Sequence, residues 1–172
     1  EKAEELYQTL SEKYRVELDI REQYSPGYKF NDWEMRGVPV RIEIGPRDIE
    51  ANKCVAVRRD TSEKIEVNLE ELSSKLKDIL EDIQRNMYNV CAERVKEKTT
   101  VAKNLDEFIE NLNKNQGYIK TMWCGDSKCE EKIHELTGAK SRCIPFMQEK
   151  LSDKCVCCGK PADTMVVWGR QY

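Results

Sequence analysis

The stretch "KIEVNLEELSSKLKDILEDIQRNM" (residues 64–87) changes its hydrophobic period part-way, and this change decides the fold class. Residues 64–68 alternate apolar and polar side chains, which predicts a β-strand. From Leu69 onward, apolar residues recur every three or four positions, which predicts one long helix that runs to about Lys98. A strand that leads directly into an amphipathic helix favours an α/β layer fold.

The residues before this stretch carry further strand and helix patterns. Helical spacing predicts a helix over residues 1–13, and turn residues place residues 21–37 in a loop. An α/β sheet that opens on a helix would be unusual if complete. We therefore expect the first domain to be incomplete at its N-terminus. The segments predicted as strands are 14–20, 38–44 and 53–60.

The end of the chain has a different character. A shorter helix is predicted over residues 104–115, opened by Asn104, and a strand over residues 118–124. One short helix and short strands around cysteine turns follow. We place one domain at residues 1–100, which includes the long helix, and a small α+β domain at residues 101–172.

Composition narrows the class of protein. The 172 residues are 39% hydrophobic and 35% charged, with a net charge of -3. The sequence contains no apolar run near the ~20 residues of a membrane span, and its acidic, amphipathic start is unlike a signal peptide. We expect a soluble, cytoplasmic protein without a membrane partner. Residues 36–59 carry six basic and three acidic residues, a weak indication of a basic site on an acidic body.

The cysteines point to metal binding. Six of the eight lie between Cys124 and Cys158, and without a secretion signal this clustering favours a metal over a disulfide framework. Zinc is usually held by two ligand pairs from two turns. Cys124 with Cys129 and Cys155 with Cys158 supply such pairs, so we predict one structural zinc ion with four thiolate ligands.

The segment "CVCCGK" (155–160) leaves the fourth ligand open. Gly159 gives room at the sulfur of Cys158, which favours that residue, and Cys157 is the alternative. A redox pair is disfavoured because Gly-Lys-Pro follows instead of a helix. A catalytic zinc is disfavoured because four thiolates leave no position for water. The other cysteines, Cys54, Cys91 and Cys143, are predicted to pack in cores, and His134 to be solvated or to cap a helix.

The stretch "GYKFNDWEMRG" (27–37) combines aromatic and charged side chains. Single-stranded RNA is bound by stacking bases on aromatic rings and by hydrogen bonds to base edges. An arginine matches the O6/N7 edge of guanine, and a carboxylate accepts guanine's N1–H and N2–H. The alternative is that these rings belong to the core, because large aromatic side chains are highly buried on average.

Longer segments resemble a known family. "SPGYKFNDWEMRGVPVRIEIGPRDIEANKCVAVRRD" (25–60) resembles the anticodon-binding domain of prolyl-tRNA synthetase. "CGDSKCEEKI" (124–133), "GAKSRCIPF" (138–146), "CVCCGKPA" (155–162) and "WGRQY" (168–172) resemble the zinc-binding-like domain that ends the archaeal/eukaryotic-type enzyme. The resemblance covers nearly the whole chain.

This resemblance implies a homodimeric class II aminoacyl-tRNA synthetase, a ligase that charges tRNA-Pro with proline using ATP and magnesium. The class II motifs that hold ATP are missing from the sequence, so we expect a separate catalytic domain before Glu1 and no activity from this chain alone. In the family the last tyrosine approaches the active site, which implies that role for Tyr172. The alternative is a non-catalytic tRNA-binding and zinc-ribbon interaction module. Neither reading involves DNA.

The resemblance also gives a more specific role to the aromatic and charged residues of the 27–37 stretch. Proline anticodons share two consecutive guanines, and we expect Glu34, Arg36 and Arg41 near these bases. Phe30 and Trp33 would stack on them or shape the loop. The residues expected to bind tRNA phosphates are Lys53, Arg58 and Arg59.

Overall fold

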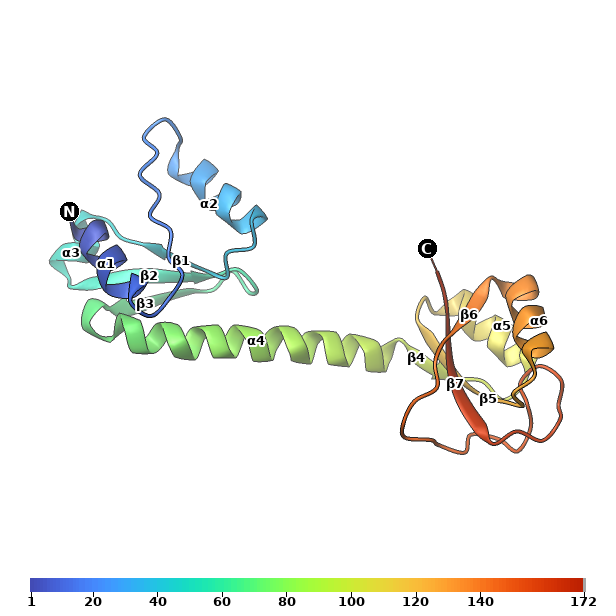
Figure 1. Ribbon diagram of the computed structural model, residues 1–172. Coiled ribbons are helices and arrows are strands. Elements are labelled where there is room, and N and C mark those ends of the chain that lie inside the picture. Colours follow the sequence, from blue (N-terminus) through green and yellow to red (C-terminus); the bar gives the residue numbers. More distant parts are fainter. Residues whose placement is uncertain (172) are drawn as a thin grey trace. The chain divides into compact units, whose positions relative to one another are not determined.

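The computed structural model describes residues 1–171, and the chain divides into two compact units (Figure 1). The first unit is Glu1–Asn89, and the second begins at Val90. The division lies inside helix α4 (Leu72–Glu97), earlier in the chain than the predicted boundary after residue 100. Each unit has hydrophobic clusters of its own.

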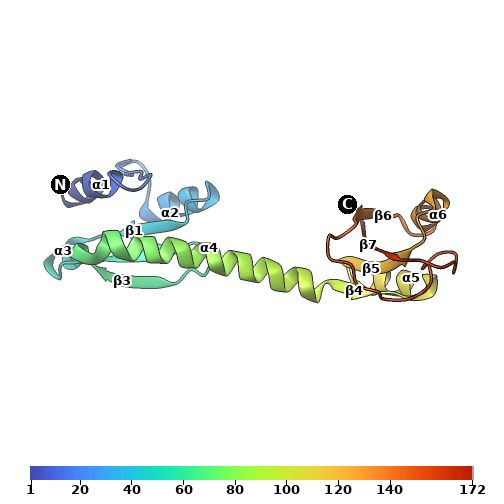
Figure 2. The same ribbon diagram turned by 60° about the horizontal axis from the view of Figure 1, so that its bottom comes forward.

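The first unit is built on a three-stranded antiparallel sheet of order β1-β2-β3. Its strands are β1 (Val40–Glu43), β2 (Lys53–Arg58) and β3 (Lys64–Asn68), with the short helix α3 (Pro46–Glu50) between β1 and β2. A single turn of 3-10 helix, η1 (Leu69–Glu71), leads into α4, which runs alongside this sheet (Figure 2). The predicted change from strand to long helix is confirmed.

One face of this sheet shares a core with α4. Cys54 and Ala56 of β2 and Val67 of β3 pack with the apolar stripe of the helix and with Leu10 of α1 (Lys2–Ser11). The stripe buries its residues in the first half of α4 because only that half meets the sheet. Its buried residues are Leu72, Leu76, Ile79 and Ile83.

Residues 21–37 contain a helix, α2 (Pro26–Met35), where the sequence predicted a loop. Ser25 caps this helix by accepting a hydrogen bond from the backbone N–H of Tyr28 at 3.4 Å, and Pro26 occupies the first turn. Gly37, with φ at +86°, ends the turn that follows. The loop prediction is wrong because Ser-Pro, which is also a turn signal, here starts a helix.

Residues 14–20 form no strand: Tyr14 lies in a bend and residues 15–20 have no regular structure, so that prediction is also wrong. A strand needs a hydrogen-bonded partner. The edge strand β1 pairs with β2 and forms no ladder with residues 14–20. Val16 and Leu18 instead line a cavity of about 650 Å³. Val40 and Ile42 of β1 and residues of α1, α2 and α4 line the same cavity.

The second unit holds a four-stranded sheet of order β4-β5-β7-β6, in which β4 and β5 are parallel and the other pairs antiparallel. Phe108, Ile133 and Trp168 are buried in its main cluster. Asn104 caps α5 by accepting a hydrogen bond from the backbone N–H of Glu107, as predicted. The elements are β4 (Thr99–Val101), α5 (Leu105–Lys114), β5 (Tyr118–Trp123), α6 (Ser127–Thr137), β6 (Ala139–Cys143) and β7 (Thr164–Arg170).

Of the remaining predictions for single residues, two are confirmed and two are wrong. Cys54 is buried and His134 exposed, as expected. Cys91 and Cys143 are exposed, so their assignment to a core is wrong. Cys91 lies beyond the buried half of α4, and β6 exposes every residue after Ala139. Within residues 1–171, no helix is both long enough and apolar enough to cross a membrane.

Candidate nucleic-acid interface and metal centre

Four cysteines of the second unit come together at one point. The sulfur atoms of Cys124, Cys129, Cys155 and Cys158 all lie within 4.8 Å of one another. The Sγ atom of Cys124 is 3.7 Å from that of Cys129 and 3.7 Å from that of Cys158. These are the four residues that the sequence predicted as metal ligands.

Short local structures bring these sulfur atoms together. Cys124 directly follows β5, and Cys129 lies near the start of α6, whose N-cap Asp126 accepts from the backbone N–H of Lys128. Residues 155–160 form a tight turn in which the N–H of Cys155 donates to the carbonyl of Lys160 at 2.7 Å. Gly159, with φ at +71°, occupies the left-handed position of this turn.

The cluster fits a zinc ion on geometry. A tetrahedral ion with Zn–S bonds of about 2.3 Å separates its sulfur ligands by about 3.8 Å. The distances from the Cys124 sulfur to those of Cys129 and Cys158, both 3.7 Å, match that value. Hydrogen bonding from the backbone of Lys160 lowers the pKa of Cys158 to about 7, which favours the thiolate. Burial raises the pKa of Cys129, and a bound cation would favour its thiolate.

Cys157 is placed differently from its neighbours. It is half-buried and packs against both hydrophobic clusters of the second unit. It is not among the cysteines grouped as possible ligands. The geometry therefore favours Cys158 over Cys157 as the fourth donor.

In the first unit, three predicted base-contacting residues meet between α2 and β1. The guanidinium of Arg41 lies 4.1 Å from the ring centroid of Phe30. Its Nη1 donates to the carboxylate of Glu34 at 2.5 Å, and its Nε donates to Glu43 at 2.9 Å. Phe30 and Glu34 are one helical turn apart on α2, and the guanidinium of Arg41 on β1 contacts both. We call these three residues the α2–β1 cluster.

Trp33 and Arg36 lie elsewhere on α2. The Nε1 of Trp33 donates to Asp19 at 2.9 Å, which ties the ring to the segment before the helix. Arg36 lies 5.0 Å from the Trp33 ring centroid and donates to Asp32 at 3.1 Å. Hydrogen bonds from Arg21 hold the pKa of Asp19 well below its usual range. Trp33 therefore lies in a fixed ionic network.

The three residues predicted to bind phosphate are not brought together. Arg59 and Lys53 are both exposed: Lys53 begins β2, and Arg59 directly follows its last residue. The Arg58 side chain is buried, with its Nη2 2.8 Å from Asp60 and its Nη1 2.6 Å from Asp82. Two carboxylates already neutralise Arg58, which disfavours a phosphate contact there. The prediction of phosphate binding therefore remains for Lys53 and Arg59.

The comparisons with known proteins match both units. The family model described as "Anticodon binding domain" matches residues 1–79. The model described as "Prolyl-tRNA synthetase, C-terminal" matches residues 105–172. The chain belongs to the prolyl-tRNA synthetase family. It contains an anticodon-binding domain and the C-terminal domain of that family, in this order.

Curated relatives align with the whole chain over 172 residues. Proline–tRNA ligases of Clostridium novyi (strain NT) and Clostridium botulinum (strain Okra / Type B1) are each 51% identical, and that of Ruminiclostridium cellulolyticum is 50% identical. The chain covers 36% of the length of each. It therefore spans about a third of these prolyl-tRNA synthetases.

Tyr172, assigned by resemblance to the synthetase active site, lies outside the described residues. The strand that leads to it is anchored by Arg170, which donates to the carbonyl of Thr137 at 2.8 Å and to Asn113 at 3.1 Å. The sequence reasoning missed Asp19, Arg21 and Tyr24, which surround α2. The spacing of two tyrosines four residues apart, at 24 and 28, was the available signal.

Proposed function

We propose that this chain is the anticodon-recognition and C-terminal structural region of a proline–tRNA ligase, a class II aminoacyl-tRNA synthetase. The whole enzyme would join proline to tRNA-Pro at the expense of ATP, with magnesium, in the cytoplasm and as a homodimer. The observation that carries the proposal is the order of the two matched domains on one chain, together with about half-identity to proline–tRNA ligases along its full length.

The α2–β1 cluster supports recognition of guanine. The carboxylate of Glu34 is an acceptor for guanine N1–H and N2–H, and Arg41 is a donor to O6 or N7. Glu34 and Arg41 now pair with each other, and the Glu34 side chain is 47% exposed. An ion pair with such an exposed partner is worth only about 0–1 kcal/mol, so exchanging it for hydrogen bonds to a base costs little.

Equilibrium binding of labelled anticodon stem-loops tests this reading. The wild-type chain is expected to prefer the tRNA-Pro stem-loop over a version in which each anticodon guanine is replaced by adenine. Glu34→Ala is expected to reduce that preference by about tenfold, because one good base contact is worth about 1–3 kcal/mol. Glu81→Ala, at an exposed glutamate on α4, is the control. Equal binding of both RNAs by the wild type would overturn the proposal.

Phosphate contacts by Lys53 and Arg59 have a different signature. Arg59→Gln should weaken binding of every RNA to a similar degree and reduce the slope of log K against log salt by about 1. Lys77→Gln, at an exposed lysine of α4, is the matched control. A loss confined to the tRNA-Pro sequence would contradict a phosphate contact.

We further propose that Cys124, Cys129, Cys155 and Cys158 hold one zinc ion, with Cys157 as the alternative to Cys158. When bound, zinc would cross-link the end of β5, the start of α6 and the 155–160 turn. Elemental analysis and X-ray absorption at the zinc edge should give one zinc per chain with four sulfur neighbours. Cys158→Ser should lose a sulfur neighbour and Cys157→Ser should retain all four; the reverse result would assign Cys157.

The catalytic centre of the enzyme is proposed to lie in a domain outside these residues, with Tyr172 directed toward it. ATP–pyrophosphate exchange with proline and this chain alone is expected to give no turnover, and turnover would overturn that assignment. A full-length protein that binds tRNA but does not charge it would instead point to a non-catalytic tRNA-binding module.

A further inference from the structure

A row of stacked side chains lies beside α2, separate from the α2–β1 cluster. The rings of Tyr24 and Tyr28 stack with centroids 4.4 Å apart and planes 17° apart. The Arg21 guanidinium lies 5.1 Å from the Tyr24 centroid and 5.7 Å from the Trp33 ring. Arg36 lies 5.0 Å from the same tryptophan. We call the row Arg36, Trp33, Arg21, Tyr24 and Tyr28 the aromatic column.

Two carboxylates hold the arginines of this column in place. Asp19 accepts from the Nε and Nη2 of Arg21 at 2.9 and 2.7 Å, and from Trp33 at 2.9 Å. Asp32 lies 2.9 Å from Arg21 and 3.1 Å from Arg36. Because both guanidinium groups are neutralised and oriented, the column is ordered before any ligand arrives, which lowers the entropic cost of binding.

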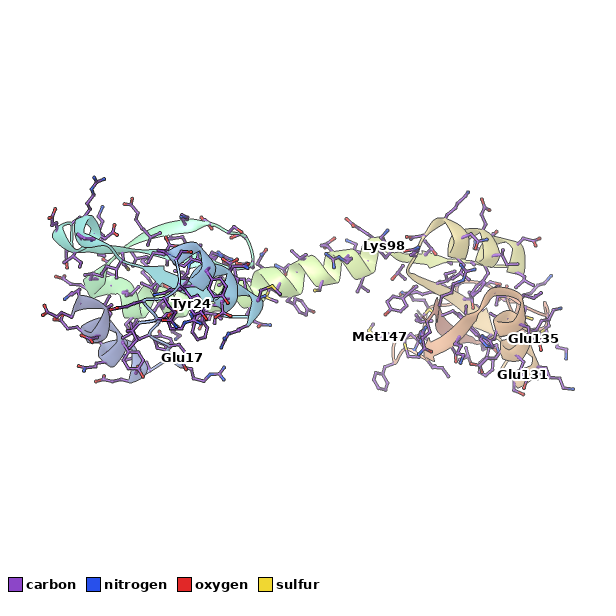
Figure 3. All side chains as sticks on the ribbon, turned by 90° about the horizontal axis from the view of Figure 1, so that it is seen from above. Glu17, Tyr24, Lys98, Glu131, Glu135 and Met147 are labelled. Carbon is purple, nitrogen blue, oxygen red and sulfur yellow. The ribbon has the colours of Figure 1, made fainter. Side chains whose placement is uncertain are left out.

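The column ends at an open ring. Tyr28 is 52% exposed and Tyr24 38% exposed, and Tyr28 lies in the first turn of α2. Figure 3 marks Tyr24 in the first unit, next to that turn in sequence. One side of the Tyr28 ring meets Tyr24. A large ring at the end of an ordered stack, and half exposed, offers a flat π surface that a core aromatic would not.

The position of Tyr28 on the helix separates it from the α2–β1 cluster. At about 3.6 residues per turn, Phe30 is rotated by roughly 200° from Tyr28, and Glu34 follows Phe30 on its face. Asp32 and Arg36 follow Tyr28 at intervals of four. The helix therefore carries two chemically different faces. One carries Phe30 and Glu34 of the α2–β1 cluster. The other carries the exposed ring of Tyr28, and its charged groups, Asp32 and Arg36, are already paired with each other.

We propose that Tyr28 stacks on an unpaired base of the RNA that occupies the α2–β1 cluster, at a nucleotide flanking the guanines. The proposal rests on the proposed tRNA-binding function. Unpaired RNA bases stack on exposed aromatic rings, and such stacking tolerates any base because every base has a π face. The contact would add affinity without adding sequence preference. The simplest competing role for the tyrosine stack is to hold the 21–25 segment against α2.

The test uses the 172-residue chain and a tRNA-Pro anticodon stem-loop that carries 2-aminopurine at one unpaired position at a time. Stacking on Tyr28 should quench fluorescence at one flanking position. Tyr28→Leu, which keeps an apolar contact with Tyr24, should relieve that quenching and weaken binding about tenfold. The loss should be equal for the guanine-substituted stem-loop, and Tyr28→Phe should behave as wild type.

Tyr88→Leu, at an exposed tyrosine of α4, is the matched control and should change neither signal. Binding by Tyr28→Leu within twofold of wild type, with the quenching intact at every position, would overturn the proposal. So would lost affinity with intact quenching, which indicates that Tyr28 only holds the loop. Failure of the guanine reading gives a different pattern, because the wild type would then bind both stem-loops equally while the Tyr28 effects remain.

Discussion

Arg58 and Asp60 make the stability of the first unit sensitive to acid. Hydrogen bonds from Arg58 lower the pKa of Asp60 to about 2, against about 3.9 in an unfolded chain. Because the folded value is the lower one, the pair stabilises the fold fully above about pH 4 and loses its contribution as pH falls through about 2. We predict that Asp60→Asn flattens this acid limb in urea unfolding between pH 2 and 6. Asp78→Asn, at an exposed position on α4, should keep the wild-type slope; equal slopes in both variants would contradict the assignment.

Neighbouring arginines should differ in their cost to stability. Arg58→Met leaves Asp60 in a buried site without its partner, and we expect a loss of about 3 kcal/mol in the free energy of unfolding. Arg59→Met changes an exposed side chain and should stay within about 0.5 kcal/mol. Chemical denaturation of the two variants measures both, and equal losses would show that the buried ion pair is not what stabilises this corner.

These two residues also show what sequence reasoning reaches at the residue scale. Strand alternation separates Arg58 from Arg59, but it does not say which side is covered. Arg58 is covered where it pairs with Asp82 of α4, which lies 24 residues later in the sequence. The cluster of four cysteines was predictable because its two pairs sit in short local turns. The aromatic column was not predictable, because Asp19 and Arg21 contact Trp33 through the helical conformation of a segment that the sequence predicted as a loop.

At the scale of elements, hydrophobic periodicity predicted the correct secondary structure where a pattern is typical of only one kind of element. The long helix, β2, β3 and α5 follow directly from their spacing. Residues 26–35 have no clear apolar stripe, because α2 buries none of its residues in a core. Hydrophobic periodicity therefore could not indicate this helix. Residues 14–20 carry a strand pattern, and the burial of residues 14–18 alternates, but the pattern does not say whether a partner strand is present.

The cavity between residues 14–20 and β1 suggests a place for a partner strand. A strand placed before α1 would form a β–α–β unit with residues 14–20, and such crossovers make the two strands parallel. It would enter the cavity lined by Val16, Leu18, Val40 and Ile42. We expect a chain extended before Glu1 by a ten-residue strand segment to unfold about 5–10 °C higher.

Amide hydrogen exchange checks this prediction at the right place. The extension should protect the backbone amides of residues 14–20 and of β1, which lie beside the cavity. The same ten residues in scrambled order are the control. An unchanged unfolding midpoint, or higher stability without new protection at residues 14–20, would show that the cavity does not receive a strand.

For the whole molecule, two units with separate cores predict two unfolding transitions with different dependence on metal. Zinc would join the end of β5 to α6 and the 155–160 turn, so it should stabilise only the second unit. A zinc chelator should lower the second unit's midpoint by more than about 10 °C in calorimetry and leave the first unit unchanged.

In a Trp33→Phe variant, fluorescence follows Trp123 and Trp168 of the second unit and should move with the chelator-sensitive transition. Cys158→Ser should reproduce the shift without chelator, whereas Cys157→Ser should remain chelator-sensitive. A single transition, or a chelator shift shared by both transitions, would mean that the units do not unfold independently.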